Sequence, residues 1–261
     1  MDSLYIIKIG GNIIDDEEKL SAFLKDFAEV KGYKILVHGG GKLATQLADQ
    51  LGVQQQMVNG RRITDAHTLK IVTMVYAGYI NKNIVAQLQK NSCNAIGLSG
   101  ADGNAIQAHK RINTSTDYGF AGDIDVVNVR LLQTLLQQEL TIVLCPITHN
   151  NQGQLLNTNA DTIAQETAKA LSQSYDVQLI YSFEKAGVLK DADNDQTVIN
   201  QINPPYYSQL KEQGVIYAGM LPKLDNAFAA VSNGVKKVII GKAENLHALI
   251  SGTSGTSIVN E

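Results

Sequence analysis

The chain has 261 residues, of which 44% are hydrophobic and 18% charged, and this composition predicts a globular protein with a sizeable core. Its 22 basic and 25 acidic residues give a formal net charge of −3, which disfavours a nucleic-acid-binding protein because that class usually carries a basic excess. The two cysteines, Cys93 and Cys145, form no C-x-x-C pair, so a structural zinc site or a redox motif is not expected.

The sequence predicts neither a signal peptide nor a membrane segment. The N-terminus opens directly into an apolar strand, and the longest apolar stretch, residues 71–80, is far too short to span a bilayer. Two widely spaced cysteines are typical of a protein in a reducing compartment. We therefore expect a cytoplasmic protein that binds neither membrane nor nucleic acid.

The first part of the chain alternates predicted strands and helices. Apolar runs at residues 4–9 and 34–37 predict buried strands, and each run ends in a glycine-rich turn. Helical patterns follow them, the first ending at about residue 30 and the second covering residues 42–51. This alternation predicts a parallel sheet with crossover helices.

The middle of the chain contains smaller elements. Residues 53–64 are polar and β-prone, and they predict a hairpin around Asn59-Gly60 because Asn-Gly favours a tight two-residue turn. A long amphipathic helix is predicted over residues 65–88, and small antiparallel strands over residues 105–129.

The other predicted strands are 95–98, 141–146, 177–182, 237–241 and 255–259, and the other predicted helices are 131–138, 160–171, 205–213 and 222–233. These elements restore the alternation of strand and helix. We predict an N-terminal lobe, residues 1–175, a C-terminal lobe, residues 176–261, and one continuous sheet that crosses both.

Two glycine-rich turns follow the first two predicted strands, at Gly10-Gly11 and at Gly39-Gly40-Gly41. Glycine has no Cβ, so its backbone N–H can approach a phosphate oxygen closely. Neither turn fits G-x-G-x-x-G or G-x-x-x-x-G-K-[ST], which excludes a Rossmann dinucleotide site and a P-loop. In open α/β sheets, ligands bind beyond the carboxyl ends of the strands, where both turns are predicted to lie.

Three charged residues accompany these turns. Lys8 lies near the carboxyl end of an apolar strand, where a charge is costly unless it is paired or faces a site. Lys223 lies in the first turn of a predicted helix, where a cation opposes the helix dipole unless an anion binds nearby. Asp161 is either an ordinary acid at a helix start or a carboxylate that positions both lysines.

Five segments occur along the chain in the order I-I-K-I-G-G-N at 6–12, L-V-H-G-G-G at 36–41, V-N-G-R-R-I-T at 58–64, L-L-N-T-N-A-D at 155–161 and A-G-M-L-P-K at 218–223. Together they resemble the acetylglutamate kinases of the amino-acid kinase superfamily, and the resemblance covers nearly the whole chain. It implies an α/β fold, a three-layer αβα sandwich with a central, mostly parallel sheet. The carbamate, aspartate and uridylate kinases share the glycine turns but are not expected to combine the hairpin motif with N-x-N-A-D.

The resemblance implies roles for the residues around the transferred phosphoryl group. Lys8 and Lys223 would stabilise that group, and Asp161 would organise the two lysines. Four glycines would offer backbone N–H donors to it, and the last two of them would also contact the acylated glutamate: Gly10, Gly11, Gly40 and Gly41.

The resemblance also implies how the substrates bind. Arg62, rather than the adjacent Arg61, would pair with the α-carboxylate of the acylated glutamate, and Asn157 would hold this substrate from the other side. ATP with Mg²⁺ would bind mainly on the C-terminal lobe, residues 176–261. No side chain is assigned as a metal ligand. The residues expected at the nucleotide are Gly10, Ser182, Phe183, Gly187, Val188, Val215, Tyr217, Gly219 and Met220.

The implied reaction is ATP-dependent phosphorylation of the γ-carboxylate of N-acetyl-L-glutamate, the second step of arginine biosynthesis. A glutamate carboxyl group in water has a pKa of about 4.3 and is already ionised near neutral pH, so no general base is required. His38 is accordingly expected to be a structural residue of its turn. The uncharged stretch at residues 54–57 leaves open another acyl group, such as N-succinyl.

Phe183 departs from the family pattern, which usually has aspartate at this place, so the nucleotide contacts there are in question. Glu184 or Lys185 is a hypothetical replacement for the contact of that aspartate. Arginine-inhibited relatives carry an additional N-terminal helix that links dimers into hexamers, whereas the first strand here starts by residue 4. We therefore expect a homodimer that arginine does not inhibit.

Two alternatives remain open. One is another kinase of the superfamily that acts on carbamate or an amino acid. The other is a regulator that binds a nucleotide or an amino acid without catalysis. The presence of Lys8, Asp161 and Lys223 disfavours the regulator, and only Phe183 favours it.

Overall fold

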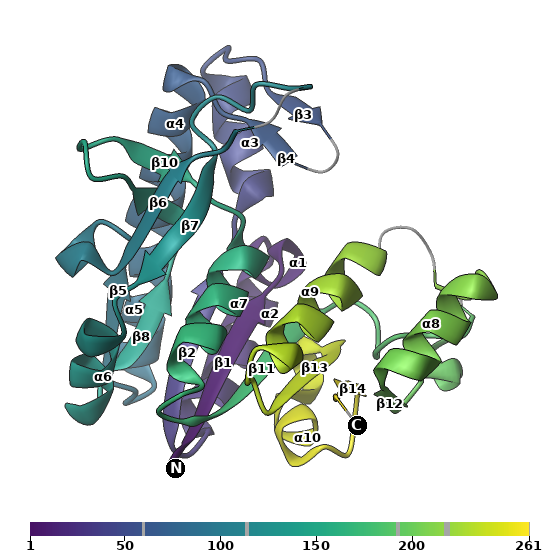
Figure 1. Ribbon diagram of the computed structural model, residues 1–261. Helices are drawn as coiled ribbons and strands as arrows, with labels where there is room; N and C mark the ends of the chain where they lie inside the picture. Colours follow the sequence, from purple (N-terminus) through teal and green to yellow (C-terminus); the bar gives the residue numbers. More distant parts are fainter. Residues whose placement is uncertain (59–60, 113–114, 192–193, 217–219, 261) are drawn as a thin grey trace.

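The computed structural model describes residues 1–58, 61–112, 115–191, 194–216 and 220–260. An eight-stranded sheet crosses the molecule in the order β12-β14-β13-β11-β1-β2-β8-β5 (Figure 1). Its strands are β1 (Ser3–Ile9), β2 (Tyr33–His38), β5 (Ala95–Leu98), β8 (Thr141–Leu144), β11 (Asp176–Phe183), β12 (Gln201–Ile202), β13 (Lys237–Lys242) and β14 (Thr256–Ile258). All neighbouring strands are parallel except β13 and β14, so the prediction of one continuous, mostly parallel sheet is confirmed.

Helices cover both faces of this sheet, which makes the predicted three layers (Figure 1). The helices of one layer are α6 (Val129–Gln137), α7 (Ala160–Leu171) and α9 (Leu221–Ser232), with α8 (Pro204–Glu212) beside α9. The opposite layer contains α1 (Gly11–Ile14), α2 (Glu17–Glu29), α5 (Asn81–Lys90) and α10 (Leu246–Ser251). Because both faces are covered, the strands are apolar on both sides and appear in the sequence as continuous apolar runs.

Side chains of β1 alternate between the two layers. Leu4 and Ile6 pack in the core beneath α7, whereas Ile7 and Ile9 pack in the core beneath α2. The period of two therefore places Lys8 on the α7 side of the sheet, at the carboxyl end of the strand.

Capping side chains fix the starts of several helices. In each case an Asp or Asn oxygen accepts a hydrogen bond from a backbone N–H of the first turn, which satisfies a donor that has no partner within the helix. Such caps begin α2 (Asp16), α4 (Ala66–Thr73, capped by Asp65), α6 (Asn128), α7 (Asn159) and α8 (Asn203). The capped start of α7 matters most here, because Asp161 lies in its first turn.

Smaller elements extend beyond the carboxyl ends of β1 and β2. A four-stranded sheet of order β10-β9-β6-β7 is formed by β6 (Ile106–Lys110), β7 (Gly122–Val127), β9 (Ile147–His149) and β10 (Leu155–Asn157). The predicted hairpin is confirmed as β3 (Gln56–Val58) and β4 (Arg61–Ile63), which pair antiparallel; its turn, Asn59-Gly60, lies outside the described residues. The helices α3 (Gly41–Gln50) and α4 (Ala66–Thr73) lie beside this hairpin (Figure 1).

The prediction of one regular helix over residues 65–88 is wrong in its middle. α4 continues into a π-helical stretch, Met74–Ile80, which we call the π segment, and α5 begins directly after it. Such wide turns are frequent at functional sites. Here the π segment packs against the second glycine turn, which hydrophobic periodicity within the helix does not reveal.

Among the described residues, no helix combines the length and the hydrophobicity needed to cross a membrane.

Candidate active site

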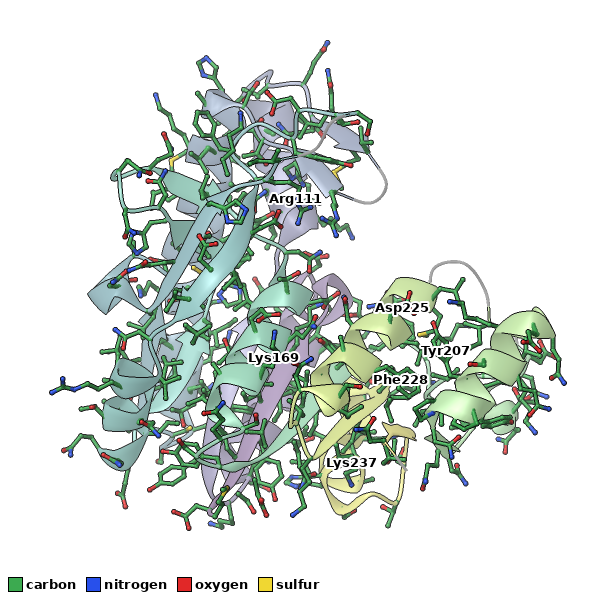
Figure 2. All side chains as sticks on the ribbon, viewed as in Figure 1. Arg111, Lys169, Tyr207, Asp225, Phe228 and Lys237 are labelled. Atoms are coloured by element: carbon green, nitrogen blue, oxygen red, sulfur yellow. The ribbon has the colours of Figure 1, made fainter. Side chains whose placement is uncertain are left out.

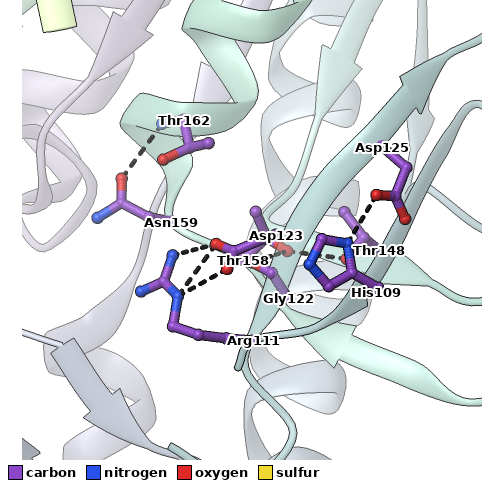
Figure 3. Close-up of polar contacts among 9 residues, drawn as sticks. All are labelled: His109, Arg111, Gly122, Asp123, Asp125, Thr148, Thr158, Asn159 and Thr162. Atoms are coloured by element: carbon purple, nitrogen blue, oxygen red, sulfur yellow. Dashed lines mark hydrogen bonds and ion pairs between the residues drawn. The ribbon is translucent and has the colours of Figure 1, made fainter. Parts of the chain in front are cut away.

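Lys8 and Asp161 form an ion pair between the sheet and α7. The Lys8 Nζ lies 2.7 Å from Asp161 Oδ1, and both side chains are largely buried. Asn159 holds the aspartate in place, because its Oδ1 accepts from the backbone N–H of Asp161 at 2.7 Å. The same oxygen accepts from the backbone N–H of Thr162 at 3.3 Å (Figure 3). A charge near the end of an apolar strand is expected to be paired or to face a site, and Asp161 is the charged partner of Lys8.

Lys223 completes this cluster from the first turn of α9, with its Nζ 4.0 Å from Asp161 Oδ2. Burial raises the pKa of Asp161, but the charges of Lys8 and Lys223 outweigh burial and hold that pKa below its ordinary value. Burial lowers the pKa of Lys223, and the charge of Asp161 partly opposes that shift. The cluster thus contains two cations and one anion, which leaves one positive charge for an anionic ligand.

Two aromatic residues of β11 support the cluster, and sequence reasoning did not predict either contact. The Lys223 Nζ lies 4.9 Å from the ring centroid of Phe183, within cation–π range. Tyr181 pairs with Lys8 in the strand register, and its hydroxyl donates to the Asp161 carbonyl at 3.4 Å. Burial raises the pKa of Tyr181 well above its usual value, so the hydroxyl keeps its proton. In the sequence, only the alternation of side chains along β11 indicates that Tyr181 and Phe183 share one face of the sheet.

The two glycine turns lie side by side, because Ile9 and His38, the last residues of β1 and β2, are register partners. A helix starts at each turn. The Gly10 carbonyl accepts from the N–H of Ile13 at 3.3 Å, and the Gly40 carbonyl accepts from the N–H of Ala44 at 3.1 Å. In a planar trans peptide, the N–H of the following residue points opposite to the carbonyl. The N–H groups of Gly11 and Gly41 therefore point out of the N-terminal ends of their helices.

Gly40 occupies a position that requires glycine. Its φ of +142° is rare for residues with a side chain, and a Cβ built there would lie 2.1 Å from Ile80 Cδ1 and 3.3 Å from Tyr76 Cδ1. The turn is therefore pressed against the π segment.

Arg62 reaches the second turn from β4. Its Nη2 donates to the Gly41 carbonyl and to Thr45 Oγ1, each at 2.9 Å, and its Nη1 contacts Gln55 Oε1. Asn157, the last residue of β10, donates to Thr64 Oγ1 at 3.0 Å. The structure thus brings both residues predicted for substrate binding to the same side of the glycine turns.

These residues enclose a cavity of about 210 Å³. Its lining consists of Gly39, Gly40, Gly41, Met57, Arg61, Arg62, Tyr76, Arg111, Ala121, Gly122, Pro146, Asn157, Thr158, Asn159 and Ala160. Ala160 precedes Asp161, so the cavity adjoins the charged cluster.

Arg111 is a cavity residue that the sequence did not reveal. It lies in the N-terminal half of the molecule (Figure 2) and pairs with Asp123 of β7 (Figure 3). Its Nε donates to both carboxylate oxygens at 3.0 Å, and its guanidinium lies 5.9 Å from the ring centroid of Tyr118. A polar residue after a short strand carries no distinctive pattern, so only the tertiary structure identifies it.

The predicted nucleotide residues lie on the other side of the cluster. Ser182 is buried at the end of β11, and its carbonyl oxygen lies 3.6 Å from where a Cβ of Gly10 would be. Val188 is buried and donates its N–H to Thr256 Oγ1 at 2.7 Å, and a Cβ on the preceding Gly187 would lie 2.6 Å from that same oxygen.

Val215 is half-buried, and Met220 is buried at the start of α9. Tyr217 and Gly219 lie outside the described residues. The helices α8 and α9 pack against each other, because the rings of Tyr207 and Phe228 stack at 4.8 Å and the Tyr207 hydroxyl donates to Asp225 at 2.7 Å (Figure 2).

A larger cavity, of about 650 Å³, lies at the opposite, amino-terminal edge of the sheet. Its lysine, Lys34, already donates to the carbonyls of Phe27, Ala28 and Val30 at 2.8–3.0 Å. That lysine therefore ends α2 and is not poised toward a ligand. The smaller cavity, next to the charged cluster, is the candidate active site.

Solved structures share this architecture. The smu.665 protein of Streptococcus mutans UA159 is 27% identical, with a TM-score of 0.80 and coverage of 99% of both chains. The carbamate kinase of Giardia lamblia, solved with AMP-PNP, has a TM-score of 0.69 at 15% identity and covers 100% of this chain and 99% of its own. At that identity the likeness shows the fold alone.

Sequence relatives are considerably closer. The chain is 56% identical to the acetylglutamate kinase of Cytophaga hutchinsonii over 262 residues, with 99% of both chains covered. It is 54% identical to that of Parabacteroides distasonis, with 95% of this chain and 97% of the relative covered, and 36% identical to that of Methanopyrus kandleri over the same shares. Residues 3–242 match the Amino acid kinase family. The chain therefore belongs to the amino acid kinase family, within its group of acetylglutamate kinases.

Proposed function

We propose that this chain transfers the γ-phosphoryl group of ATP to the γ-carboxylate of an N-acylated L-glutamate, with N-acetyl-L-glutamate as the main acceptor. The products are an acyl phosphate and ADP, in the second step of arginine biosynthesis. The observation that carries the proposal is the Lys8–Asp161–Lys223 cluster, which adjoins both glycine turns and the arginine-lined cavity. The full-length likeness to acetylglutamate kinases supports it.

The chemical difficulty is to bring a carboxylate close to an anionic phosphoryl group. Lys8 and Lys223 offset this repulsion from two sides, and Asp161 keeps their ammonium groups in place. The N–H groups of Gly11 and Gly41, which point out of their helices, would supply further donors. The acceptor carboxylate is already ionised near neutral pH, so no general base is needed to remove a proton from it.

The substrate cavity would hold the rest of the acylated glutamate. Arg62 would bind the α-carboxylate, since a guanidinium suits a carboxylate and this one is already oriented by the Gly41 carbonyl and Thr45. Asn157 would contact the substrate from the opposite wall, and the acyl group would face the part of the cavity that contains Met57 and Arg111.

ATP would bind along the end of β11 and the start of α9, where most of the predicted nucleotide residues lie. Mg²⁺ would arrive with the nucleotide and neutralise charge on its phosphates. Among the described residues there is no group of three or more His, Cys, Asp or Glu side chains that could hold a metal ion, and Asp161 is engaged by two lysines. In this proposal the metal would be held chiefly by phosphate oxygens and water.

The test is ADP release by the purified protein with Mg²⁺-ATP and a panel of acceptors: N-acetyl-L-glutamate, N-succinyl-L-glutamate, L-glutamate, L-aspartate and carbamate. We expect turnover with N-acetyl-L-glutamate and trapping of its acyl phosphate by hydroxylamine. Preference for the succinyl compound would change the assigned acyl group. Binding of ATP without turnover of either acylated glutamate would overturn the proposal in favour of a regulator.

We also propose that two copies of the chain associate through α3 and the π segment. A mainly apolar hollow there is lined by Leu43, Gln46, Leu47, Gln50, Met74, Val75 and Tyr79. Met74 and Tyr79 are 54% and 61% exposed. Such a surface is unfavourable in water unless a partner covers it. Light scattering should give a dimer that Tyr79→Glu dissociates, whereas Val126→Glu, at another exposed apolar residue, should leave it intact. A monomeric wild type would refute this assembly.

The division of labour between residues 1–175 and 176–261 follows from the same proposal. The acylated glutamate would bind to the first segment and most of the nucleotide to the second. Lys8 and Lys223, one from each segment, would meet at the transferred phosphoryl group.

A further inference from the structure

His38 ends β2 directly before the second glycine turn, and no role in the reaction has been given to it above. Its side chain is fully buried. Because β2 alternates between the layers, His38 faces the α5 side of the sheet, away from Lys8, and it cannot act on the phosphoryl group directly.

The hydrogen bonds of His38 allow one proton arrangement. Its Nδ1 lies 2.8 Å from the Gly39 carbonyl oxygen, which can only accept, so Nδ1 carries a proton. Its Nε2 lies 3.2 Å from Asn81 Nδ2, which donates to it and also to the Val143 carbonyl at 3.0 Å. A neutral imidazole with the proton on Nδ1 satisfies every partner.

Asn81 is itself fixed in orientation, so it can select this tautomer. Its Oδ1 accepts from the Lys82 Nζ at 3.0 Å, and the same ammonium donates to the Gly97 carbonyl at 2.8 Å. A flipped amide would turn its oxygen toward the Val143 carbonyl and its NH₂ toward the ammonium. Burial lowers the pKa of His38 to about 4, so the ring is neutral near neutral pH.

The bond from His38 has a consequence one peptide further along the chain. The peptide between Gly39 and Gly40 is trans and planar, so its N–H points opposite to its carbonyl. With the Gly39 carbonyl held toward the buried ring, the Gly40 N–H is turned away from the core. Both glycines line the substrate cavity.

We propose that His38, in the tautomer selected by Asn81, is a positioning residue that aims the Gly40 N–H into the substrate cavity. The π segment takes part, because it ends at Ile80, which packs on Gly40, and delivers Asn81 as the next residue. This inference rests on the proposed function, in which the Gly40 N–H contacts the acylated glutamate or the phosphoryl group.

The kinetic test compares His38→Asn with His38→Leu. The asparagine amide places an N–H donor near the position of Nδ1, whereas leucine has no donor. Loss of one well-placed donor to a reacting group costs about 10²–10³ in rate, and because misdirecting a donor costs less, we expect His38→Leu to lower kcat/KM for the acylated glutamate by about 10–100-fold. His38→Asn should stay within about threefold of wild type, since it replaces the hydrogen bond. The KM for ATP should change little in either variant.

Leu136→Ala is the matched control for lost stability, because this side chain is fully buried on α6 at the far layer. It should lower the melting temperature without changing kcat/KM. Equal activity of the Leu and Asn variants in an active wild-type background would overturn the positioning role, as would an equal loss in the Leu136→Ala control.

An NMR measurement separates this inference from the proposed function. A long-range ¹H–¹⁵N spectrum of the wild type should show a neutral His38 ring with the proton on Nδ1 between pH 6 and 8. The backbone amide resonance of Gly40 should shift on addition of N-acetyl-L-glutamate in the wild type and in His38→Asn, but not in His38→Leu. A proton on Nε2 would refute the inference even if the kinase is active. An inactive wild type with the predicted ring would refute the function alone.

Discussion

The first and second glycine turns end neighbouring strands, yet different interactions surround them. Beside the first turn lie two lysines and a carboxylate, on the α7 side of the sheet. On the opposite side, the second turn is held by a neutral imidazole, and Arg62 binds its last carbonyl. The difference suggests that charge is concentrated where charge moves in the reaction, whereas uncharged hydrogen bonds fix the backbone that must stay in place. Four changes can break or sharpen this comparison.

The largest effect is expected at the charged side. Lys8→Met removes a cation that would stabilise the transition state, and we expect kcat to fall by about 10³-fold or more. Lys8→Arg retains the charge but not the geometry, and it should still lose most activity. The measurement is steady-state ADP release, with ATP binding by calorimetry as the control. A Lys8→Met variant with near-normal kcat would remove the cluster from the mechanism.

At the neutral side, the expected large effect is on stability in acid. Because the pKa of His38 is about 4 when folded and about 6.5 in the unfolded chain, the unfolded state gains a proton first as pH falls. The free energy of unfolding should therefore fall between pH 6.5 and pH 4, by about 3 kcal/mol for this shift in the pKa of His38. Urea unfolding at several pH values should show this loss in wild type and not in His38→Asn. Parallel curves for the two proteins would contradict it.

Arg62 tests the border between the two sides. Arg62→Lys keeps a positive charge but loses the two-nitrogen fork, in which Nη2 donates to the Gly41 carbonyl and Thr45 Oγ1 while Nη1 contacts Gln55. We expect the KM for N-acetyl-L-glutamate to rise by about tenfold, with a smaller change in kcat. The neighbouring Arg61, which is exposed, is the comparison: Arg61→Lys should raise KM less. An equal effect at both positions would show that charge, rather than this geometry, holds the substrate.

The smallest expected effect is at Phe183. Its ring supports the ammonium group of Lys223, and a partly buried cation–π contact contributes on the order of 1 kcal/mol, which corresponds to a few-fold loss of kcat. In Phe183→Leu the pKa of Lys223, already lowered by burial, should fall further, so the alkaline limb of the kcat–pH profile should move to lower pH. Phe183→Tyr retains a ring and should behave as wild type. An unchanged profile for leucine would assign Phe183 to the nucleotide instead.

Sequence reasoning predicted the parts of this site that depend on local pattern. The apolar run ending at Lys8, the capped helix start before Asp161 and the hairpin that carries Arg62 all follow from residue type and spacing. The parallel register of β1 and β2 brings the two glycine turns together, whereas Asp161 and Arg62 reach them through the packing of α7 and of the hairpin.

Contacts between distant segments could not be predicted in this way. The π segment depends on packing against Gly40, and Phe183 meets Lys223 only through the docking of α9 on the sheet. Arg111 joins the cavity because Asp123 on the adjacent strand holds it there. Each of these contacts depends on tertiary packing. The spacing of hydrophobic residues along one sequence, with a period of 2 or 3.6, predicts strands and helices but not how they pack together.

The π segment makes the number of residues between Tyr76 and Asn81 as important as their identity. Wide π-helical turns hold about one residue more than α-helical turns of the same length, so deleting one residue there would convert the stretch to ordinary α-helical turns and change which side chains point toward the second glycine turn. The packing of Tyr76 and Ile80 on Gly40 would be lost, or Asn81 and Lys82 would leave His38 and the Gly97 carbonyl. We therefore expect this stretch to tolerate exchanges of side chain better than any insertion or deletion.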